Sequence, residues 1–165
     1  MRDDEILFAK LYEDVKIPTK DVENGGYDIY AHFEGPSMTI APHETKLIPT
    51  GLLSAFSNRY VFILKERGST GAKGIGQRSG VIDSGFRGEW HIAVTNHNDK
   101  PLVITKEDKE GGTFSSAYLV HPYAKAICQG ILVPVPSVTV REVSPDEIMA
   151  VKSTRGTGKL GSSGK

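Results

Sequence analysis

The sequence contains very little cysteine, because Cys128 is the only one among its 165 residues. One cysteine cannot form a disulfide within the chain, and it cannot supply a cysteine-rich zinc site. Five histidines are present, but no two of them have the H-x-x-x-H spacing of a metal-binding helix. These absences exclude a disulfide framework and the common zinc motifs.

The sequence also lacks an excess of charge of one sign and any long apolar run. Its 20 basic and 20 acidic residues cancel, whereas nucleic-acid-coating proteins carry a basic surplus. No segment approaches the roughly 20 apolar residues of a membrane helix, and the charged N-terminal stretch has no signal-peptide core. We therefore expect a soluble cytoplasmic protein with neither nucleic acid nor membrane as its partner. A local basic group could still hold a small anionic ligand.

Glycine and proline are plentiful, with 18 and 9 copies. Together with many short apolar runs they favour an all-β fold, in a chain whose length fits one domain. We expect strands over residues 7–11 with 15–17, 27–31, 38–40, 46–48, 52–55, 60–64, 91–95, 102–105, 118–120, 126–135 and 138–143. Only residues 144–147 (Ser-Pro-Asp-Glu) have the cap, proline and glutamate of a helix start. This spacing of strands predicts a β-barrel or a jelly-roll-like sandwich.

Three short features lie close together between Lys65 and Trp90. Residues 67–71 (Arg-Gly-Ser-Thr-Gly) combine a guanidinium, two hydroxyls and a tight backbone, which suits phosphate oxygens. Residues 80–83 (Gly-Val-Ile-Asp) place one carboxylate at the end of an apolar run, and residues 84–88 (Ser-Gly-Phe-Arg-Gly) predict a hairpin turn that carries a ring. Together they predict a nucleotide site.

Two polar residues inside apolar strands add to this picture. Asp28 lies between Tyr27 and Ile29 and points away from their shared face, where a carboxylate needs solvent or a partner. Gln129 interrupts an apolar strand, and a buried amide needs hydrogen-bond partners. Each residue can be structural or part of a site. Asp83 taken alone is also compatible with a turn-capping role.

The last fourteen residues, 152–165, contain four basic and no acidic residues and are rich in glycine and serine. Such a segment buries too little apolar surface to offset its ordering entropy. We predict a domain over residues 1–151 followed by a flexible C-terminal arm over 152–165. The arm can be a lid that orders over an anionic ligand or a disordered, solubilising end. It matches G-x-G-x-x-G formally, but the chain ends too soon for a Rossmann helix.

Nearly the whole chain resembles the homotrimeric dUTPases, which hydrolyse deoxyuridine triphosphate. All five motifs of that family have counterparts in the same order: residues 25–31, 67–71, 80–89, 126–129 and 155–164. The third, Gly-Val-Ile-Asp-Ser-Gly-Phe-Arg-Gly-Glu, is the most specific match. The fourth departs from the family, because Ala124, Lys125 and Ala126 stand where the family usually has Gly-Asp-Arg.

The resemblance implies a jelly-roll-like β-barrel that assembles as a trimer, with active sites at subunit interfaces. It implies hydrolysis of dUTP to dUMP and pyrophosphate with Mg²⁺. Asp83 is then the catalytic residue, which orients and deprotonates the water that attacks the α-phosphate. The ring of Phe86 packs beneath the deoxyribose and leaves no room for a 2′-hydroxyl. Arg67, Gly68 and Ser69 hold the phosphates.

The resemblance implies roles for other residues as well. The backbone that contains Gly80, Val81 and Ile82 belongs to the segment that recognises the uracil edge, and Gln77 falls where the family often has an asparagine near the nucleotide. Asp28 and Gln129 act around the metal, through its waters. When the arm closes, the expected substrate contacts come from Arg155, Leu160, Gly161, Ser162 and Ser163.

Three departures from the family pattern leave alternatives open. Gly68 replaces a phosphate-contacting serine, Phe86 replaces a tyrosine, and Leu160 replaces an aromatic residue that stacks on uracil. One alternative is a dCTP deaminase or a bifunctional enzyme of the same fold, for which Glu89 is the nearest glutamate. Another is a non-catalytic nucleotide- or partner-binding module on this scaffold.

Overall fold

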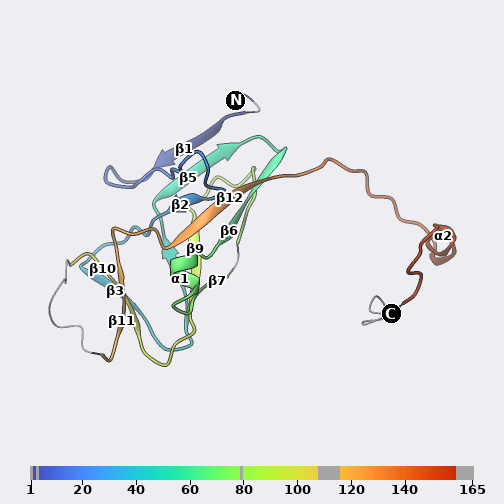
Figure 1. Ribbon diagram of the computed structural model, residues 1–165. Coiled ribbons are helices and arrows are strands. Elements are labelled where there is room, and N and C mark those ends of the chain that lie inside the picture. The colour runs from blue at the N-terminus through green and yellow to red at the C-terminus, as the bar shows by residue number, and fades with distance from the viewer. Residues whose placement is uncertain (1, 3, 79, 108–115, 159–165) are drawn as a thin grey trace.

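The structure is a computed structural model, and it describes residues 2, 4–78, 80–107 and 116–158. In chain order the elements are β1 (Ile6–Lys10), β2 (Tyr27–Ile29), β3 (Ser37–Ile40), β4 (Thr45–Pro49), β5 (Leu52–Phe56), β6 (Tyr60–Lys65), α1 (Gly68–Gly71), β7 (Ile75–Arg78), β8 (Val81–Ile82), β9 (His91–Asn96), β10 (Leu102–Thr105), β11 (Leu119–Pro122), β12 (Cys128–Pro134) and α2 (Pro145–Ala150). The protein is therefore mostly β, as the sequence predicts (Figure 1).

A four-stranded sheet in the order β2-β12-β6-β8 carries most of the residues that matter below. Its centre is the antiparallel pair β6–β12, which runs from Tyr60 opposite Pro134 to Lys65 opposite Gln129. β6 is dense in β-branched and aromatic residues, which favour strands, and it lies between two neighbours. The short strands β2 and β8 form the two edges of this sheet.

The other strands form three smaller sheets: β1-β5, β4-β9-β7 and β11-β10-β3. All pairs are antiparallel except β10 with β11. Among the described residues these pairings do not close into a barrel.

The core is an aromatic cluster centred on Phe62, which is completely buried on β6. Its ring centroid lies 5.2 Å from Trp90, 5.3 Å from Phe56, 5.8 Å from Tyr27 and 6.2 Å from Phe8. The interplanar angles between 53° and 85° are the tilted and edge-to-face arrangements that ring quadrupoles favour. These rings come from strands of different sheets and from the segment before β9, so Phe62 joins the sheets in one core.

Two of the expected strands are wrong. Val138 and Val140, in the expected strand 138–143, are 76% and 91% exposed and lie in a segment without strand pairing. A strand must pair its backbone N–H and C=O groups, and this stretch has no neighbouring strand within the described chain. Residues 15–17 are also not a strand. Val15 is buried, but its N–H donates to the carbonyl of Tyr12 in a turn.

The predicted hairpin at residues 84–88 is wrong in one respect. The turn exists, with the N–H of Phe86 donating to the carbonyl of Asp83 at 3.0 Å. However, β8 before the turn pairs with β6, and β9 after it pairs with β4 and β7. The chain therefore passes from one sheet to another at this turn. Two elements that the sequence analysis missed, α1 and β7, lie just upstream in the glycine-rich stretch.

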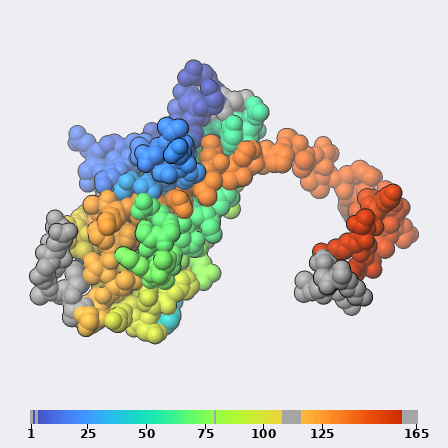
Figure 2. Space-filling view, in the orientation of Figure 1, coloured from blue at the N-terminus to red at the C-terminus, as the bar shows by residue number. Residues whose placement is uncertain are grey.

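The C-terminal part of the described chain leaves the body after β12, and α2 lies apart from the sheets (Figures 1 and 2). α2 begins as predicted: Ser144 caps it by accepting from the N–H of Glu147, whose carboxylate in turn accepts from the N–H of Ser144. None of its residues is buried, and Ile148 and Met149 are 59% and 64% exposed.

Removal of the central ring should strongly destabilise the fold. We predict that Phe62→Ala lowers the free energy of unfolding by about 3–5 kcal/mol, since it leaves a cavity in the aromatic cluster. Urea unfolding measures this loss. Val22→Ala, at a position that is 95% exposed, is the matched control, expected to stay within about 0.5 kcal/mol. A loss below about 1 kcal/mol for Phe62→Ala would show that the cluster does not carry the core.

Candidate active site

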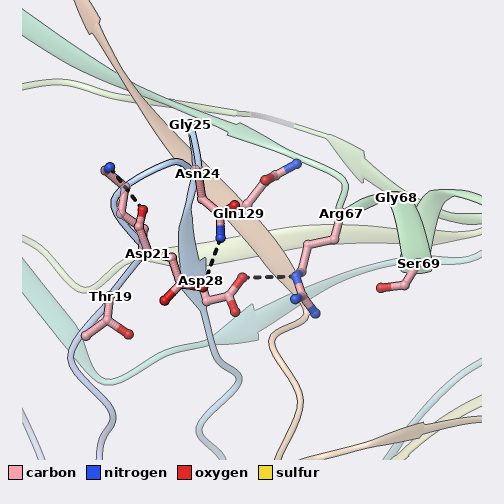
Figure 3. A pocket seen from close by; sticks show the side chains of 11 residues that line it. Thr19, Asp21, Asn24, Gly25, Asp28, Arg67, Gly68, Ser69 and Gln129 are labelled. Carbon is pink, nitrogen blue, oxygen red and sulfur yellow. Dashed lines mark hydrogen bonds and ion pairs between the residues drawn. The ribbon is translucent and has the colours of Figure 1, made fainter.

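A polar pocket of about 440 Å³ lies where β2, β12 and the end of β6 meet. We call it the Arg67 pocket. It is lined by Thr19, Lys20, Asp21, Asn24, Gly25, Gly26, Asp28, Arg67, Gly68, Ser69 and Gln129 (Figure 3). It therefore brings together five of the residues predicted for the site, from three separate motifs of the sequence. The segment 19–24 is a part of the wall that the sequence analysis missed, although its polar residues directly precede Gly25.

An ion pair crosses this pocket. The Nε of Arg67 lies 3.0 Å from Oδ1 of Asp28, and each side chain is about one-third exposed (34% for Asp28 and 32% for Arg67). The strand register explains why they meet: Asp28 on β2 is opposite Gln129 on β12, and Gln129 is opposite Lys65 on β6. Arg67 follows two residues after that last pair.

Gln129 is held from two sides. Its Nε2 donates to the backbone carbonyl of Glu66 at 2.8 Å. Its Oε1 faces Gly26, where an added Cβ would lie only 2.5 Å from that oxygen. Real Cβ atoms do not approach so closely, so a side chain at position 26 would displace the amide. Gln129 therefore makes a structural hydrogen bond and also lines the Arg67 pocket, and its role in a functional site stays a prediction.

The turn at residues 67–71 forms the opposite wall, and its two hydroxyls have different tasks. Thr70 is buried and bonds twice to Arg67: its Oγ1 accepts from the backbone N–H and donates to the carbonyl, both at 3.0 Å. Ser69 is exposed to the pocket. Because the first N–H groups of a helical turn have no partner within it, Gly68 and Ser69 offer N–H groups as well as one hydroxyl. Of the two hydroxyls considered for phosphate contact, only that of Ser69 is available.

Glu66 links this turn to β7. Its Oε1 accepts from the N–H of Gln77 at 2.9 Å, and this hydrogen bond is the largest cause that holds the pKa of the Glu66 carboxyl below its ordinary value. The side chain of Gln77 donates to the carbonyl of Arg78, while its Oε1 is buried without a hydrogen-bond partner among the described residues. Gln77 does not line the Arg67 pocket.

A second pocket, of about 390 Å³, lies at the turn after β8. We call it the Asp83 pocket, and it is lined by Leu47, Val81, Ile82, Asp83, Phe86, Glu89 and His91. It places the Asp83 carboxylate beside large apolar groups that remain exposed: Leu47 by 61%, Val81 by 60% and Phe86 by 43%. Of the lining residues, Leu47 and His91 were missed by the sequence analysis. No motif identifies them, because tertiary packing brings β4 and the start of β9 to this turn.

Glu89 has a structural task at the edge of the Asp83 pocket. Its Oε1 accepts from the N–H of Gly51 at 2.7 Å, and Gly51 has a positive φ of 68° in the turn between β4 and β5. His91 lies near the other oxygen, with Nε2 at 3.8 Å from Oε2. The carboxylate is therefore held in place by the backbone beside it.

The two pockets have no lining residue in common. Asp28 is on β2 and Val81 on β8, which are the opposite edges of the four-stranded sheet. Three strand spacings separate these edges by about 14 Å. Gly80 lines neither pocket and is packed against β6, with its carbonyl accepting from the N–H of Leu64 at 2.6 Å. One chain thus carries the two groups of predicted residues at separate places.

The described arm residues, 152–158, line neither pocket. Arg155 is exposed, and its Nε donates to the carbonyl of Gly158 at 3.3 Å within the arm itself. Leu160, Gly161, Ser162 and Ser163 lie outside the described residues.

The Arg67 pocket suits a hard cation such as Mg²⁺ better than it suits a zinc-like ion. Within the described chain, no three side chains of His, Cys, Asp or Glu are placed to hold a metal. The pocket offers the Asp28 carboxylate and the Gln129 amide oxygen in a wide polar space. Mg²⁺ usually keeps several waters and takes one or two protein carboxylates plus substrate phosphates, so the donors present fit that pattern.

These features define a class of protein: a β-sheet protein with a polar pocket that an arginine–aspartate ion pair crosses and a separate pocket that presents a carboxylate beside an exposed ring. The dUTPase family model matches residues 13–109, which is more than half of the chain. The chain belongs to the dUTPase family. The match includes Asp28, Arg67 and Asp83 and ends before Gln129 and the arm.

Curated relatives support this assignment over a longer span. The chain is 31% identical over 144 residues to the deoxyuridine 5′-triphosphate nucleotidohydrolase of Gloeobacter violaceus, covering 86% of this chain and 83% of that one. It is 28% identical over 152 residues to the enzyme of the same name from Candida albicans, covering 91% and 82%.

Solved structures share the fold. The dUTPase of Staphylococcus bacteriophage 80alpha with dUPNHPP superposes with a TM-score of 0.76 at 21% identity, covering 98% of this chain and 99% of that one. A variant of the dUTPase from phage phi11 of S. aureus, described with a structural Mg(II) ion, gives a TM-score of 0.66 at 19% identity, covering 85% and 97%. None of the described helices is long and apolar enough to cross a membrane.

Thr70 should matter for stability and Ser69 should not. We predict that Thr70→Val lowers the free energy of unfolding by about 1–3 kcal/mol, because it leaves the partly buried Arg67 N–H without its hydrogen-bond acceptor. The Arg67 carbonyl still accepts from the N–H groups of Thr70 and Gly71. Ser69→Ala, the neighbouring hydroxyl that is exposed, should change it by less than about 0.5 kcal/mol. Thermal or urea unfolding of both variants measures the difference. Equal losses for the two would contradict the assignment of tasks to these hydroxyls.

Proposed function

We propose that this protein is a dUTP diphosphatase, which hydrolyses dUTP to dUMP and pyrophosphate in the presence of Mg²⁺. The observation that carries the proposal is the Asp83 pocket, in which a carboxylate and an exposed aromatic ring share one apolar surface, in a chain that belongs to the dUTPase family. A general base beside a surface for the sugar and base is the requirement of this reaction.

The phosphates bind in the Arg67 pocket. Arg67 and Ser69 line it, and a guanidinium, a hydroxyl and free N–H groups are good partners for phosphate oxygens. The space beside Gly68 is open, since a Cβ at this position would meet no atom within 4 Å. Asp28 and Gln129 hold Mg²⁺ through its waters. When bound, the cation supplies neutralisation of charge on the phosphate oxygens. Gln77 contacts the nucleotide from β7.

Hydrolysis proceeds by attack of a water molecule on the α-phosphorus. Asp83 accepts a proton from the water as its oxygen bonds to phosphorus, and the bond to the bridging oxygen of the β-phosphate breaks. Pyrophosphate leaves with that oxygen, and dUMP keeps the new one. The backbone from Gly80 to Ile82 recognises the uracil edge, while the ring of Phe86 lies beneath the sugar. Most of the rate gain comes from positioning and from charge stabilisation.

The active enzyme is a homotrimer, in which different copies contribute the two pockets to one site. The separation of the Arg67 and Asp83 pockets within one chain supports this arrangement, because a single nucleotide must reach both groups of residues. Each subunit is a mostly β, jelly-roll-like domain over residues 1–151. The arm, 152–165, closes over the bound nucleotide with Arg155, Leu160, Gly161, Ser162 and Ser163. The cytoplasmic location expected from the sequence stays a prediction.

The activity is tested with a nucleotide panel of dUTP, dTTP, UTP and dCTP, followed by product analysis. We expect dUMP and pyrophosphate from dUTP, and little turnover of the other three. Ammonia release from dCTP would instead favour the deaminase. Absence of dUTP hydrolysis at micromolar enzyme with Mg²⁺ would refute the diphosphatase.

We predict that Asp83→Asn lowers kcat for dUTP by at least about 10²-fold, because an amide cannot accept the proton of the water. The Kd for a non-hydrolysable dUTP analogue should change by less than about fivefold, since the shape of the pocket is kept. Asp99→Asn, at a side chain that is 97% exposed, is the control and should keep full activity. Equal turnover by wild type and Asp83→Asn would favour a non-catalytic binding module.

We predict that a chain truncated after Val151 keeps its melting temperature and loses at least about tenfold in kcat/KM, as expected for a lid. The physical reason is that the described arm residues 152–158 are all exposed and add nothing to the core. Thermal unfolding and steady-state kinetics on the same samples measure both quantities. A fall of more than about 5 °C in Tm would show that the arm is structural.

A further inference from the structure

The two residues that follow Phe86, Arg87 and Gly88, determine where its backbone and its ring lie. The Nη1 of Arg87 donates to the carbonyl of Ser84 at 2.7 Å, to that of Phe86 at 3.0 Å and to that of Ser54 on β5 at 3.3 Å. One guanidinium group therefore fixes the backbone of the turn on both sides of the ring and fastens it to a neighbouring strand. This clamp holds the Cα of Phe86, but it does not determine where the ring lies.

Gly88 determines the remaining freedom of the ring. A Cβ added to Gly88 would lie 2.7 Å from Cζ and 2.9 Å from Cε2 of Phe86. Both distances are shorter than real Cβ atoms show, so the ring occupies the space that any other side chain at position 88 would fill. The far edge of the ring rests on the glycine, while 43% of Phe86 stays exposed at the Asp83 pocket.

The backbone conformation at position 88 does not require a glycine. The glycines with a positive φ in the described chain are Gly35, Gly51, Gly74 and Gly156, and Gly88 is not one of them. An alanine can therefore adopt the backbone conformation at position 88 without left-handed strain. Glycine is needed at position 88 because it has no side chain, and the ring of Phe86 occupies the space that a side chain would fill.

We propose that Gly88 is a positioning residue that sets the depth of the Phe86 ring in the Asp83 pocket, and through it the discrimination between deoxyribose and ribose. This inference rests on the proposed function, in which the ring lies beneath the sugar. The position of the ring against the glycine sets the height of the space above it, and we infer that this space fits a 2′-deoxy carbon closely. A ring lifted by a methyl group would press on every sugar and lose that close fit.

The size of the effect follows from the contact distances. A methyl group and a ring carbon in van der Waals contact lie about 3.5–4.0 Å apart, so the ring must move by about 1 Å to accommodate alanine. Misplacement of a reacting group by about 1 Å can cost up to about 10²-fold in rate. The movement should cost little stability, because the displaced atoms are the end of a rotatable, half-exposed side chain.

The test compares Gly88→Ala with Gly85→Ala, a glycine of the same turn where an added Cβ meets nothing within 4 Å and φ is not positive. We expect Gly88→Ala to lower kcat/KM for dUTP by about tenfold to a hundredfold and to reduce the ratio of kcat/KM for dUTP over UTP by at least about fivefold. Gly85→Ala should leave both within about twofold of wild type. Melting temperatures of both variants should match that of wild type. An unchanged selectivity ratio in a folded Gly88→Ala variant would overturn the proposal.

A double variant shows whether Gly88 acts through the ring. In a Phe86→Ala background the added methyl group has no ring to displace, so Gly88→Ala should change the selectivity ratio by less than about twofold. An equal effect of Gly88→Ala with and without the ring would refute the assignment. If the wild-type chain does not hydrolyse dUTP, the proposed function fails. If it does and only the Gly88 variants behave otherwise than expected, this inference alone fails.

Discussion

Six residues of β6 pair with six residues of β12 in one antiparallel register, which ends where Lys65 is opposite Gln129. Within this pair Phe62, opposite Leu132, is the centre of the aromatic cluster, so the pairing is buried where the sheets meet. At the Lys65–Gln129 end β12 also pairs with β2, which brings Asp28 next to Gln129. A slip of one residue would turn each side chain of β12 to the opposite face, and it would remove both the core contacts and the Arg67 pocket.

Three glycines of the family motifs have a common physical task in this chain, which is to leave space for a neighbour. Gly26 leaves space for the amide of Gln129, and Gly80 lies so close to β6 that a Cβ would meet the carbonyl of Leu64 at 2.6 Å. Gly88 leaves space for the ring two residues before it. In none of these three cases is a left-handed backbone involved. The motifs therefore specify close approaches as much as they specify reactive groups.

Strand periodicity predicted a large part of the fold and of the Arg67 pocket. Alternation placed Asp28 opposite in direction to Tyr27 and Ile29, and an amide in an apolar strand marked Gln129 as a residue with a specific partner. The sequence could not show that the Thr70 hydroxyl bonds to the backbone of Arg67 while the Ser69 hydroxyl faces the pocket, because both residues carry a hydroxyl in one short turn. The prediction of a hairpin at residues 84–88 was also wrong, because the strands on the two sides of this turn belong to different sheets. Turn residues indicate that the chain reverses or bends, but the choice of partner strand depends on long-range packing.

The Asp28–Arg67 ion pair constrains how the proposed substrate enters. In the chain alone the carboxylate and the guanidinium satisfy each other at 3.0 Å. A phosphate that approaches Arg67 must compete with Asp28, and a carboxylate left alone beside phosphate oxygens would repel them. A cation held near Asp28 would neutralise that carboxylate and so remove the repulsion, which would leave the guanidinium of Arg67 for the phosphate. Within the proposed function, nucleotide and Mg²⁺ therefore bind as a pair, and each lowers the cost of opening the ion pair for the other.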